Sequence, residues 1–377
     1  MTADAGVGQG DTPLALLLKE QIRAYGPMSV AQFMSDCLFH ETYGYYTRQA
    51  AVGAAGDFIT APEISQVFGE LLGLWCAVVW QQMGEPARLH LVEFGPGRGT
   101  LMADALRSAN AVARFRSSLH VHLVEINGTL QRAQRARLAA EATISWHDGW
   151  PGAATFAGDP VIVIGNEFLD ALPIEQIIAR NGAWHWREVG LDAADSFAFV
   201  NGRPSGHAID GSAREGDVRE FSEAQDHVAD LMVQYAQAGP MASLWIDYGS
   251  DTPFSGDTLQ GVRQHKYVSP FDAPGETDVT AQVDFSALVR RARDGGLGVD
   301  GVVPQAEFLG ALGIIERASR LMSANPAKAG MIETGVARLM APNGMGTRFK
   351  VVGLRSATLP PLPGFPMPAV AMGNQHD

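Results

Sequence analysis

The sequence predicts an α/β fold with a doubly wound, mainly parallel β-sheet, and two patterns support this prediction. Short apolar runs, of the length of buried strands, alternate with longer segments whose apolar residues recur at helical spacing. Glycines or acidic residues directly follow several of these runs, and open α/β sheets bind their ligands at the carboxyl ends of such strands. We expect seven core strands joined by helices, with the last strand able to run antiparallel.

The N-terminal part of the chain is predicted to be helical. Apolar spacing predicts a first helix over residues 13–24, and Ser29 is placed to cap a second one. After a glycine-rich stretch, Thr60 and Glu63 have the spacing of a capping box, and one long helix is expected over residues 64–83. This helix would lead into the first core strand.

The core is organised around a strand, a glycine turn and a helix. Residues 89–92 form an apolar run that ends at Glu93, and three glycines follow at alternate positions, namely Gly95, Gly97 and Gly99. Thr100 then opens a segment with helical spacing. Because glycine has no Cβ, a small ligand can lie directly against the backbone of this turn.

The charges near the glycine turn indicate which ligand it holds. A dinucleotide site needs the spacing G-x-G-x-x-G, with a pyrophosphate at the helix N-terminus, whereas here the third glycine comes one residue earlier. Glu93 would repel a pyrophosphate and attract a cation. Glu125 ends the next predicted strand, where a carboxylate can accept both ribose hydroxyl groups. S-adenosylmethionine fits, because it carries a sulfonium and an ammonium group and no phosphate. A dinucleotide site and a purely structural turn are the alternatives.

The rest of the chain continues the alternation with one interruption. Further core strands are predicted by apolar runs at residues 119–125, 142–147, 161–164, 242–248, 297–303 and 347–354. Residues 174–221 alternate polar and apolar side chains around turn signals such as Asn181-Gly182, which predicts an inserted antiparallel β-meander. Residues 249–280 are expected to be irregular, and the Pro-rich tail from Leu359 is expected to be disordered.

These patterns divide the chain into five predicted parts. They are an N-terminal helical extension and cofactor lid (1–84), a cofactor-binding half (85–173), the inserted meander and helix (174–241), the remainder of the core with a substrate loop (242–355) and the Pro-rich tail (356–377).

The composition excludes several classes of protein. A net charge of −13 and a pI of 5.2 argue against a nucleic-acid partner, which needs clustered Lys and Arg, and they permit a basic protein substrate. Cys37 and Cys76 lie in apolar helical patterns and are expected to be buried thiols, with no sign of a disulfide framework or metal site. No apolar run reaches the ~18 residues of a membrane helix. The N-terminus has neither a signal-peptide nor a transit-peptide pattern, so we expect a bacterial cytoplasmic protein.

Four motifs carry a resemblance to a known family. They are Gly56-Asp-Phe-Ile-Thr-Ala-Pro-Glu-Ile-Ser-Gln66, Val92-Glu-Phe-Gly-Pro-Gly-Arg-Gly-Thr100, Gly165-Asn-Glu-Phe-Leu-Asp-Ala-Leu-Pro173 and Ile246-Asp-Tyr-Gly249. Together they resemble the MidA family of S-adenosylmethionine-dependent methyltransferases, whose mitochondrial members assist respiratory complex I assembly. A further motif, Asp278-Val-Thr-Ala-Gln-Val-Asp-Phe285, is similar to a later family motif, with Gln282 where Asp is common. The resemblance implies a seven-strand class I methyltransferase core, protein arginine methylation, and a substrate akin to the NuoD-type subunit of complex I.

The residues expected to bind the cofactor lie at strand ends and in the lid. They are Glu93, Gly95, Pro96, Gly97, Gly99, Thr100, Glu125, Asp148, Trp150, Phe58 and Thr60. In this hypothesis Glu93 attracts the ammonium group and Glu125 holds the ribose. Asp148 would accept a hydrogen bond from the adenine amine, and Trp150 would flank the ring, unless these two form only a turn and a core contact. Phe58 would shield the reaction from water.

The catalytic candidates are Asn166, Glu167 and Asp170, which follow the strand at residues 161–164, where the methyl group should point. Enzymes that methylate amides or bases generally have prolines here, and this chain has none. A guanidinium stays charged, and a paired carboxylate can orient it and localise its charge. Glu167 is the first candidate for that role and Asp170 the second, with a helix N-cap as the alternative for Asp170.

The expected substrate-binding residues are Asp57, Glu63, Asp247 and His265, and Tyr43, Tyr45 and Tyr46 can line an arginine channel by cation–π contact. Glu63 can instead complete the capping box. Two other functions stay open, namely a methyltransferase for a small molecule or another nucleophile, and a non-catalytic assembly factor that retains the pocket. A homodimer is also compatible with the sequence.

Overall fold

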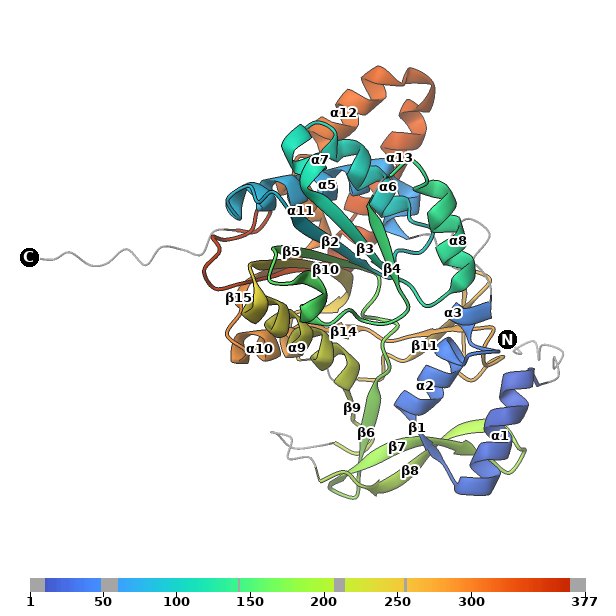
Figure 1. Cartoon of the computed structure of the whole chain (residues 1–377). Coiled ribbons are helices and arrows are strands. Elements are labelled where there is room, and N and C mark those ends of the chain that lie inside the picture. The colour runs from blue at the N-terminus through green and yellow to red at the C-terminus, as the bar shows by residue number, and fades with distance from the viewer. Residues whose placement is uncertain (1–10, 49–59, 142, 207–213, 254–255, 367–377) are drawn as a thin grey trace, which may run out of the picture.

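The computed structural model describes residues 11–48, 60–141, 143–206, 214–253 and 256–366, and it confirms the α/β fold (Figure 1). Within these ranges the central sheet has eight strands, in the order β15-β16-β10-β5-β2-β3-β4, with β14 paired to β10. Their bounds are β2 (Leu89–Phe94), β3 (Leu119–Val124), β4 (Ile144–His147), β5 (Val161–Asn166), β10 (Met241–Ser250), β14 (Val283–Asp284), β15 (Gly298–Pro304) and β16 (Phe349–Arg355).

The strand order reverses at β2, which is where a doubly wound sheet opens a ligand site. β2 pairs in parallel with β3 on one side and with β5 on the other, so the helices after β2 and β5 leave the sheet in opposite directions. β5 and β10 are also parallel. β16 pairs antiparallel with both β10 and β15, as the sequence allowed for the last strand.

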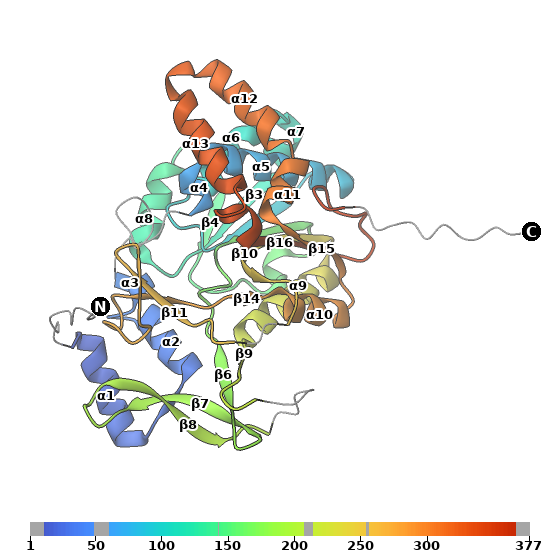
Figure 2. The same cartoon turned by 180° about the vertical axis from the view of Figure 1, so that it is seen from behind.

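Helices cover both faces of this sheet (Figures 1 and 2). Alternate residues of β5 belong to two separate cores, with Ile162 and Ile164 on one face and Val161 and Val163 on the other. The first face is covered mainly by α5 (Gln66–Gln82), α6 (Thr100–Ala109), α7 (Ala113–Ser118), α11 (Gln305–Ala311), α12 (Ile314–Ala324), α13 (Ala329–Met340) and α14 (Met345–Arg348). The exposed 3-10 turn η2 (Pro326–Lys328) connects α12 to α13. The second is covered by the 3-10 turn η1 (Ala153–Phe156), α9 (Glu223–Ala238) and α10 (Phe285–Asp294), while α8 (Gly128–Arg137) connects β3 to β4.

The predicted antiparallel insertion is confirmed and forms a second sheet. This sheet consists of β6 (Glu175–Arg180), β7 (Ala183–Leu191), β8 (Phe197–Pro204) and β9 (Val218–Phe221) from the insertion and β1 (Met28–Ser29) from the N-terminal part of the chain, all paired antiparallel. The N-terminal helices α1 (Pro13–Tyr25), α2 (Val30–Phe39) and α3 (Tyr45–Arg48) accompany this sheet, below the central one in Figure 1.

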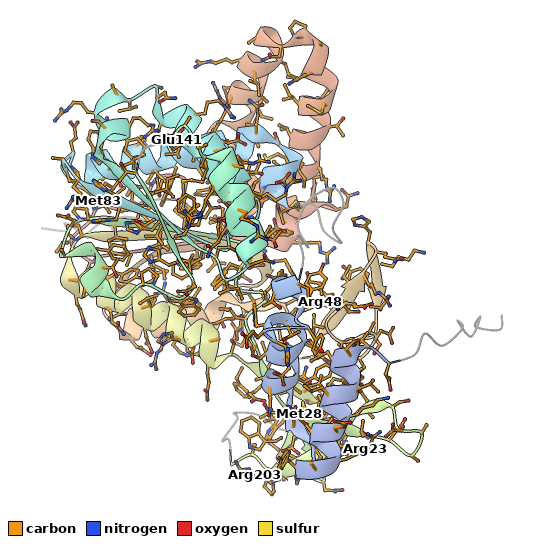
Figure 3. The ribbon with its side chains drawn as sticks, turned by 45° about the vertical axis from the view of Figure 1, so that its right-hand side comes forward. Arg23, Met28, Arg48, Met83, Glu141 and Arg203 are labelled. Carbon is orange, nitrogen blue, oxygen red and sulfur yellow. The ribbon has the colours of Figure 1, made fainter. Side chains whose placement is uncertain are left out.

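The N-terminal extension and the insertion, which the sequence analysis treats separately, share one core. Leu18 and Phe33 from the extension pack in the same buried cluster as Val189 from β7. Arg23, labelled in Figure 3, also donates two hydrogen bonds to the Asp195 carboxylate beyond β7, at 2.7 and 2.6 Å. The extension therefore depends on the insertion for its burial.

The prediction of one long helix over residues 64–83 is wrong in one respect, because the helix is interrupted at Ser65. A short helix, α4 (Ala61–Ile64), precedes α5. Ser65 between them is extended (φ −153°, ψ 124°) and caps α5 by accepting from the Val67 N–H. The expected capping box is also wrong, since the Thr60 side chain makes no capping hydrogen bond and Glu63 pairs with Thr100 instead.

Two stretches are more ordered than expected. Residues 249–280 contain a small antiparallel sheet of β11 (Gln260–Arg263), β12 (Lys266–Val268) and β13 (Asp278–Thr280). In the tail, Leu362 is buried and the Trp75 indole donates to the Pro363 carbonyl at 3.0 Å, so the prediction of disorder is wrong as far as residue 366. Residues 367–377 lie outside the described part of the chain.

Cys37 and Cys76 are buried thiols, as expected. Among the described residues, no helix has both the length and the apolar character needed to cross a bilayer.

Candidate active site

A cavity of about 710 Å³ opens at the carboxyl ends of β2, β3, β5 and β10, where the strand order reverses. This volume lies in the range of small-molecule sites, about 300–1,000 Å³. We distinguish two halves of the cavity. The β2–β3 half is lined by Glu93, the glycine turn, Thr100, Glu125 and Trp150. The β5–β10 half is lined by Asn166, Glu167, Asp170, Tyr248, Tyr46 and Asp278.

The glycine turn adopts a backbone that other residues rarely take. Gly95, Gly97 and Gly99 have φ angles of 62°, 53° and 74°, all in the left-handed region. A Cβ on Gly95 would come within 3.1 Å of the Phe168 ring. The turn therefore requires glycine for its conformation, and it leaves main chain exposed to the cavity, as the sequence predicted.

Glu93 brings an unpaired carboxylate oxygen to this turn. Its side chain is buried, and no hydrogen-bond donor among the described residues reaches Oε2. Burial, reinforced by the nearby Glu125 carboxylate, raises the pKa of Glu93 to about 8. A buried acceptor without a donor is unfavourable. A cationic ligand in the cavity would satisfy this oxygen and favour its ionised form.

Glu125 is fixed by hydrogen bonds at the end of β3. Its Oε1 accepts from the Asn127 N–H at 2.8 Å, and Oε2 accepts from Gln134 Nε2 at 3.3 Å. Burial raises the pKa of Glu125 to about 7. Gln134 also donates to the Gly97 carbonyl at 2.8 Å, so one amide joins the glycine turn to this carboxylate. The sequence analysis missed Gln134, although its helical spacing from Leu130 and Leu138 placed a polar residue on the buried face of α8.

Trp150 and Asp148 have different positions although they are close in sequence. Trp150 lines the cavity, stacked on His227 with ring centroids 5.1 Å apart and edge-on to Phe94. Asp148 is exposed and does not line the cavity, so the structure does not bring it to the predicted cofactor site.

Glu167 sits at a strained turn directly after β5. Its φ of 51° is unusual for a residue with a side chain, and such strain is often found at functional sites. Glu167 Oε1 accepts from the Ala61 N–H at 2.8 Å and from Asn166 Nδ2 at 3.2 Å. Burial raises the pKa of Glu167 to about 7, and the Ala61 N–H opposes this rise. The pKa of the half-buried Asp170 carboxyl is likewise raised to about 7, mainly by desolvation.

Asp247 does not line the cavity; its carboxylate instead holds the turn after β5 through hydrogen bonds. It is fully buried, and its Oδ2 accepts from the N–H groups of Phe168, Leu169 and Asp170 at 3.0, 2.8 and 3.2 Å. The expectation that Asp247 contacts substrate therefore does not agree with the structure. The carboxylate instead fixes the backbone that presents Glu167 and Asp170.

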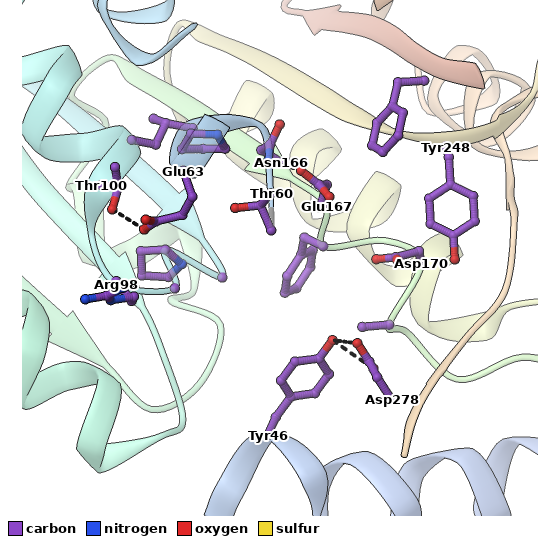
Figure 4. Close-up of a pocket in the computed structure, with 18 of the residues that line it drawn as sticks. Tyr46, Thr60, Glu63, Arg98, Thr100, Asn166, Glu167, Asp170, Tyr248 and Asp278 are labelled. Carbon is purple, nitrogen blue, oxygen red and sulfur yellow. Dashed lines mark hydrogen bonds between the residues drawn. The ribbon is translucent and has the colours of Figure 1, made fainter. Parts of the chain in front are cut away.

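Tyrosines and a further carboxylate complete the β5–β10 half (Figure 4). Tyr46 donates to both Asp278 oxygens at 3.1 Å, and Tyr248 donates to Thr280 Oγ1 at 2.6 Å. The sequence analysis gave Asp278 no role, because nothing local connects it to Tyr46 or to β5. Tyr45 lines the cavity as well, whereas Tyr43 stacks on His40 and does not.

The remaining predicted residues separate into three groups. Thr60 and Glu63 line the cavity between its halves, with Glu63 accepting from Thr100 Oγ1. His265 is exposed in the turn between β11 and β12 and does not line the cavity, while the nearby Tyr267 does. Asp57 and Phe58 lie outside the described residues. In the described ranges, no group of three or more His, Cys, Asp or Glu side chains is placed to hold a metal ion.

Comparison with known proteins agrees with this geometry. Residues 71–303 match the model of a family described as "Putative S-adenosyl-L-methionine-dependent methyltransferase". The chain belongs to this methyltransferase family. The methyltransferase is 34% identical to "Protein arginine methyltransferase NDUFAF7, mitochondrial" from Danio rerio, in an alignment that spans 88% of this chain and 84% of the relative. It is 33% identical to the Homo sapiens protein of the same name, over 91% and 83%.

A solved structure also resembles the methyltransferase over nearly its whole length. A COG1565 superfamily member from Burkholderia thailandensis, bound to S-adenosyl-homocysteine, superposes with a TM-score of 0.81 at 27% identity and covers 96% of this chain and 98% of its own. The predicted family, the methyltransferase activity and the cofactor S-adenosyl-L-methionine are thus confirmed.

Proposed function

We propose that this enzyme methylates a nitrogen of an arginine side chain in a protein substrate. The observation that carries the proposal is the pair of half-buried carboxyls with raised pKa values, Glu167 and Asp170, which line the half of the cavity beside the glycine turn. The names of the curated relatives support the same reaction. When bound, the cofactor supplies an electrophilic methyl group and leaves as S-adenosyl-homocysteine.

The β2–β3 half would hold the cofactor. The unpaired Glu93 oxygen suits the ammonium group, and Glu125, fixed by Asn127 and Gln134, is free to accept from the ribose hydroxyls. The exposed backbone of the glycine turn allows close approach of the methionine part. Trp150 offers a ring face to the adenine.

The β5–β10 half would hold the guanidinium. An ionised Glu167, already fixed through its Oε1, can pair with two guanidinium N–H groups and localise the positive charge away from the reacting nitrogen. As the nitrogen attacks the methyl carbon, the carbon–sulfur bond breaks and the nitrogen loses a proton. Asp170, whose pKa is raised to about 7, can accept that proton. Asn166 Oδ1 has no donor among the described residues and can accept a further guanidinium N–H.

The resemblance to the MidA family suggests the substrate and its setting. We propose a NuoD-like complex I subunit as the target, a role in complex I assembly, and a bacterial cytoplasmic location. Fractionation of the native host tests the location, and light scattering of the purified protein tests whether it is a homodimer.

Mass spectrometry of reaction products tests the proposed reaction. The enzyme is incubated with deuterated-methyl S-adenosylmethionine and a NuoD-type subunit, and the hydrolysed product is examined for labelled methylarginine. Glu167→Gln should lower kcat about 10- to 100-fold, because it removes a charge-assisted hydrogen bond, while the affinity for S-adenosyl-homocysteine stays within about threefold. Label on another residue type or on a small molecule would contradict the proposal. Binding of cofactor with no transfer to any basic protein would favour a non-catalytic assembly factor.

A further inference from the structure

The short helix α4 lies between the two halves of the cavity and contacts both. On one side, Thr100 Oγ1, at the start of α6 directly after the glycine turn, donates a hydrogen bond to Glu63 Oε1 (Figure 4). On the other side, the Ala61 N–H donates to Glu167 Oε1 at 2.8 Å. A single helical turn therefore joins the glycine turn to the carboxylate that is proposed to hold the substrate.

Helix α13 packs against α4. A Cβ placed on Gly335 would lie 2.8 Å from the Ile64 carbonyl oxygen and 3.3 Å from Ser65 Cβ, so the backbones of α13 and α4 meet at this glycine. Gly335 lies inside a regular helix, and what it provides is this close approach. Ala61 is completely buried. Because α4 is enclosed on these sides, it cannot shift without disturbing the glycine turn or Glu167.

We propose that α4 is a positioning element, in which Glu63 and Gly335 keep the Ala61 N–H against Glu167 in register with the bound cofactor. The proposal rests on the proposed function only where it assigns Glu167 to the substrate. A ligand that orders the glycine turn restrains Thr100, Thr100 restrains Glu63, and α4 passes the restraint to Ala61 and Glu167. Such coupling is reciprocal, so cofactor binding and the productive orientation of Glu167 favour each other.

The first test follows amide hydrogen exchange at Ala61 by NMR, in the full chain with and without saturating S-adenosyl-homocysteine. We expect the ligand to slow this exchange about fivefold in the wild-type protein, at the low end of usual coupling between sites. Glu63→Ala should abolish the slowing. Glu63→Gln, whose amide oxygen can still accept from Thr100, should restore most of it. Exchange that does not respond to bound ligand in the wild type, or that still responds in E63A, overturns the proposal.

The second test compares two glycines of α13. Gly335→Ala would push α4 away, whereas Gly330→Ala places a Cβ with nothing within 4 Å and is the matched control. Gly330 is the second residue of α13 and Gly335 lies in its interior, so the thermal midpoints of both variants are needed to separate helix propensity from the displacement of α4. G335A should lower kcat for methyl transfer about tenfold, as misplacement of a positioned group does, while the KM for the cofactor rises by no more than about fivefold, the size of the reciprocal coupling. G330A should match the wild type.

The thermal midpoint is measured for the same variants to separate positioning from stability. A lower midpoint in G335A with unchanged kcat would identify a merely structural contact and overturn the proposal.

The proposed function and the role of α4 are refuted by different results. A wild-type enzyme that methylates no arginine refutes the proposed function, and the exchange experiment still decides on α4. Arginine methylation at wild-type rates in both E63A and G335A refutes the role of α4 and leaves the proposed function standing.

Discussion

The two halves of the cavity are built from the chain in different ways. The β2–β3 half is local, because Glu93, the glycine turn, Glu125 and Gln134 all come from two successive strand–helix units. The β5–β10 half is assembled from distant segments. Glu167 is held by Ala61, more than a hundred residues before it, and Asp278 is held by Tyr46 from the N-terminal extension. The β2–β3 half thus depends on local chain geometry, and the β5–β10 half depends on the tertiary fold.

This difference indicates how each half responds to change. The β2–β3 half, which we propose for the cofactor, is a backbone surface with fixed φ angles, so a side chain added to the turn should remove cofactor binding outright. The β5–β10 half, which we propose for the substrate, is a set of side chains held by hydrogen bonds from distant segments. Loss of one such bond should misorient the carboxylates and leave the cofactor in place. The following predictions test this separation, starting with the largest expected effect.

Gly97→Val should break the β2–β3 half alone. A β-branched residue at a φ of 53° costs about 1–2 kcal/mol in backbone strain, and its side chain would occupy the ligand surface. We expect the affinity for S-adenosyl-homocysteine, measured by calorimetry, to fall at least about 100-fold, with an unchanged circular dichroism spectrum. Gly149→Ala is the control, because nothing lies within 4 Å of its added Cβ. Micromolar binding by G97V would show that the turn is not the cofactor site.

Asp247→Asn should damage the β5–β10 half with a smaller effect. An amide cannot reproduce all the acceptor positions of the carboxylate, whose oxygens accept from the N–H groups of residues 168–170 and of Tyr248. A buried N–H left without its acceptor costs about 1–3 kcal/mol, which should appear as a lower free energy of unfolding in urea. We expect kcat for methyl transfer to fall about tenfold and the affinity for S-adenosyl-homocysteine to fall by no more than about fivefold, the size of the coupling through α4. A large loss of cofactor affinity would contradict the separation of the halves.

The same contrast explains what the sequence could predict. The strand–turn–helix at residues 89–107 is encoded by neighbouring residues, so its elements, its glycines and the cofactor were predictable. Periodicity also predicted the antiparallel insertion, whereas the direction of the last strand was left open and the structure shows it to be antiparallel. The sequence placed Asp247 at the correct strand end. Whether its carboxylate faces the cavity or binds the loop after β5 depends on the position of that loop, which comes from a different part of the chain.

The errors share a physical cause. Thr60 and Glu63 have the spacing of a capping box, but a tertiary partner, Thr100, takes the Glu63 carboxylate and overrides the local signal. The Pro-rich tail has no periodic pattern that predicts structure, yet Leu362 is buried in the core and the Pro363 carbonyl accepts from Trp75 of α5, which no local rule could indicate. Tyr46 and Asp278 are 232 residues apart in sequence, so their contact could not be predicted from either alone.

The smallest expected effect concerns the pH dependence of cofactor binding. In the unliganded protein the pKa of Glu93 is raised to about 8, above its ordinary value of 4.5, mainly by burial. A folded-state pKa above the unfolded value means that Glu93 stabilises the unliganded fold at low pH and loses this contribution as the pH rises from about 4.5 to 8. A bound ammonium group favours the ionised carboxylate, so binding releases a proton below pH 8. The affinity for S-adenosyl-homocysteine should therefore rise several-fold between about pH 6 and 8.

Glu93→Gln sharpens this prediction, because glutamine fills the same space without a titrating charge. The variant should bind S-adenosyl-homocysteine several-fold more weakly at pH 8, where it lacks one charge-assisted hydrogen bond, and nearly as well as the wild type at pH 6. Calorimetry in buffers of different ionisation enthalpy measures the released proton directly, and this release should be smaller in E93Q. Glu125, whose pKa is raised to about 7, leaves a residual pH dependence in the variant. If E93Q keeps the full pH dependence of the wild type, Glu93 does not face the cationic part of the cofactor, and the charge argument for the β2–β3 half fails even though the glycine turn stands.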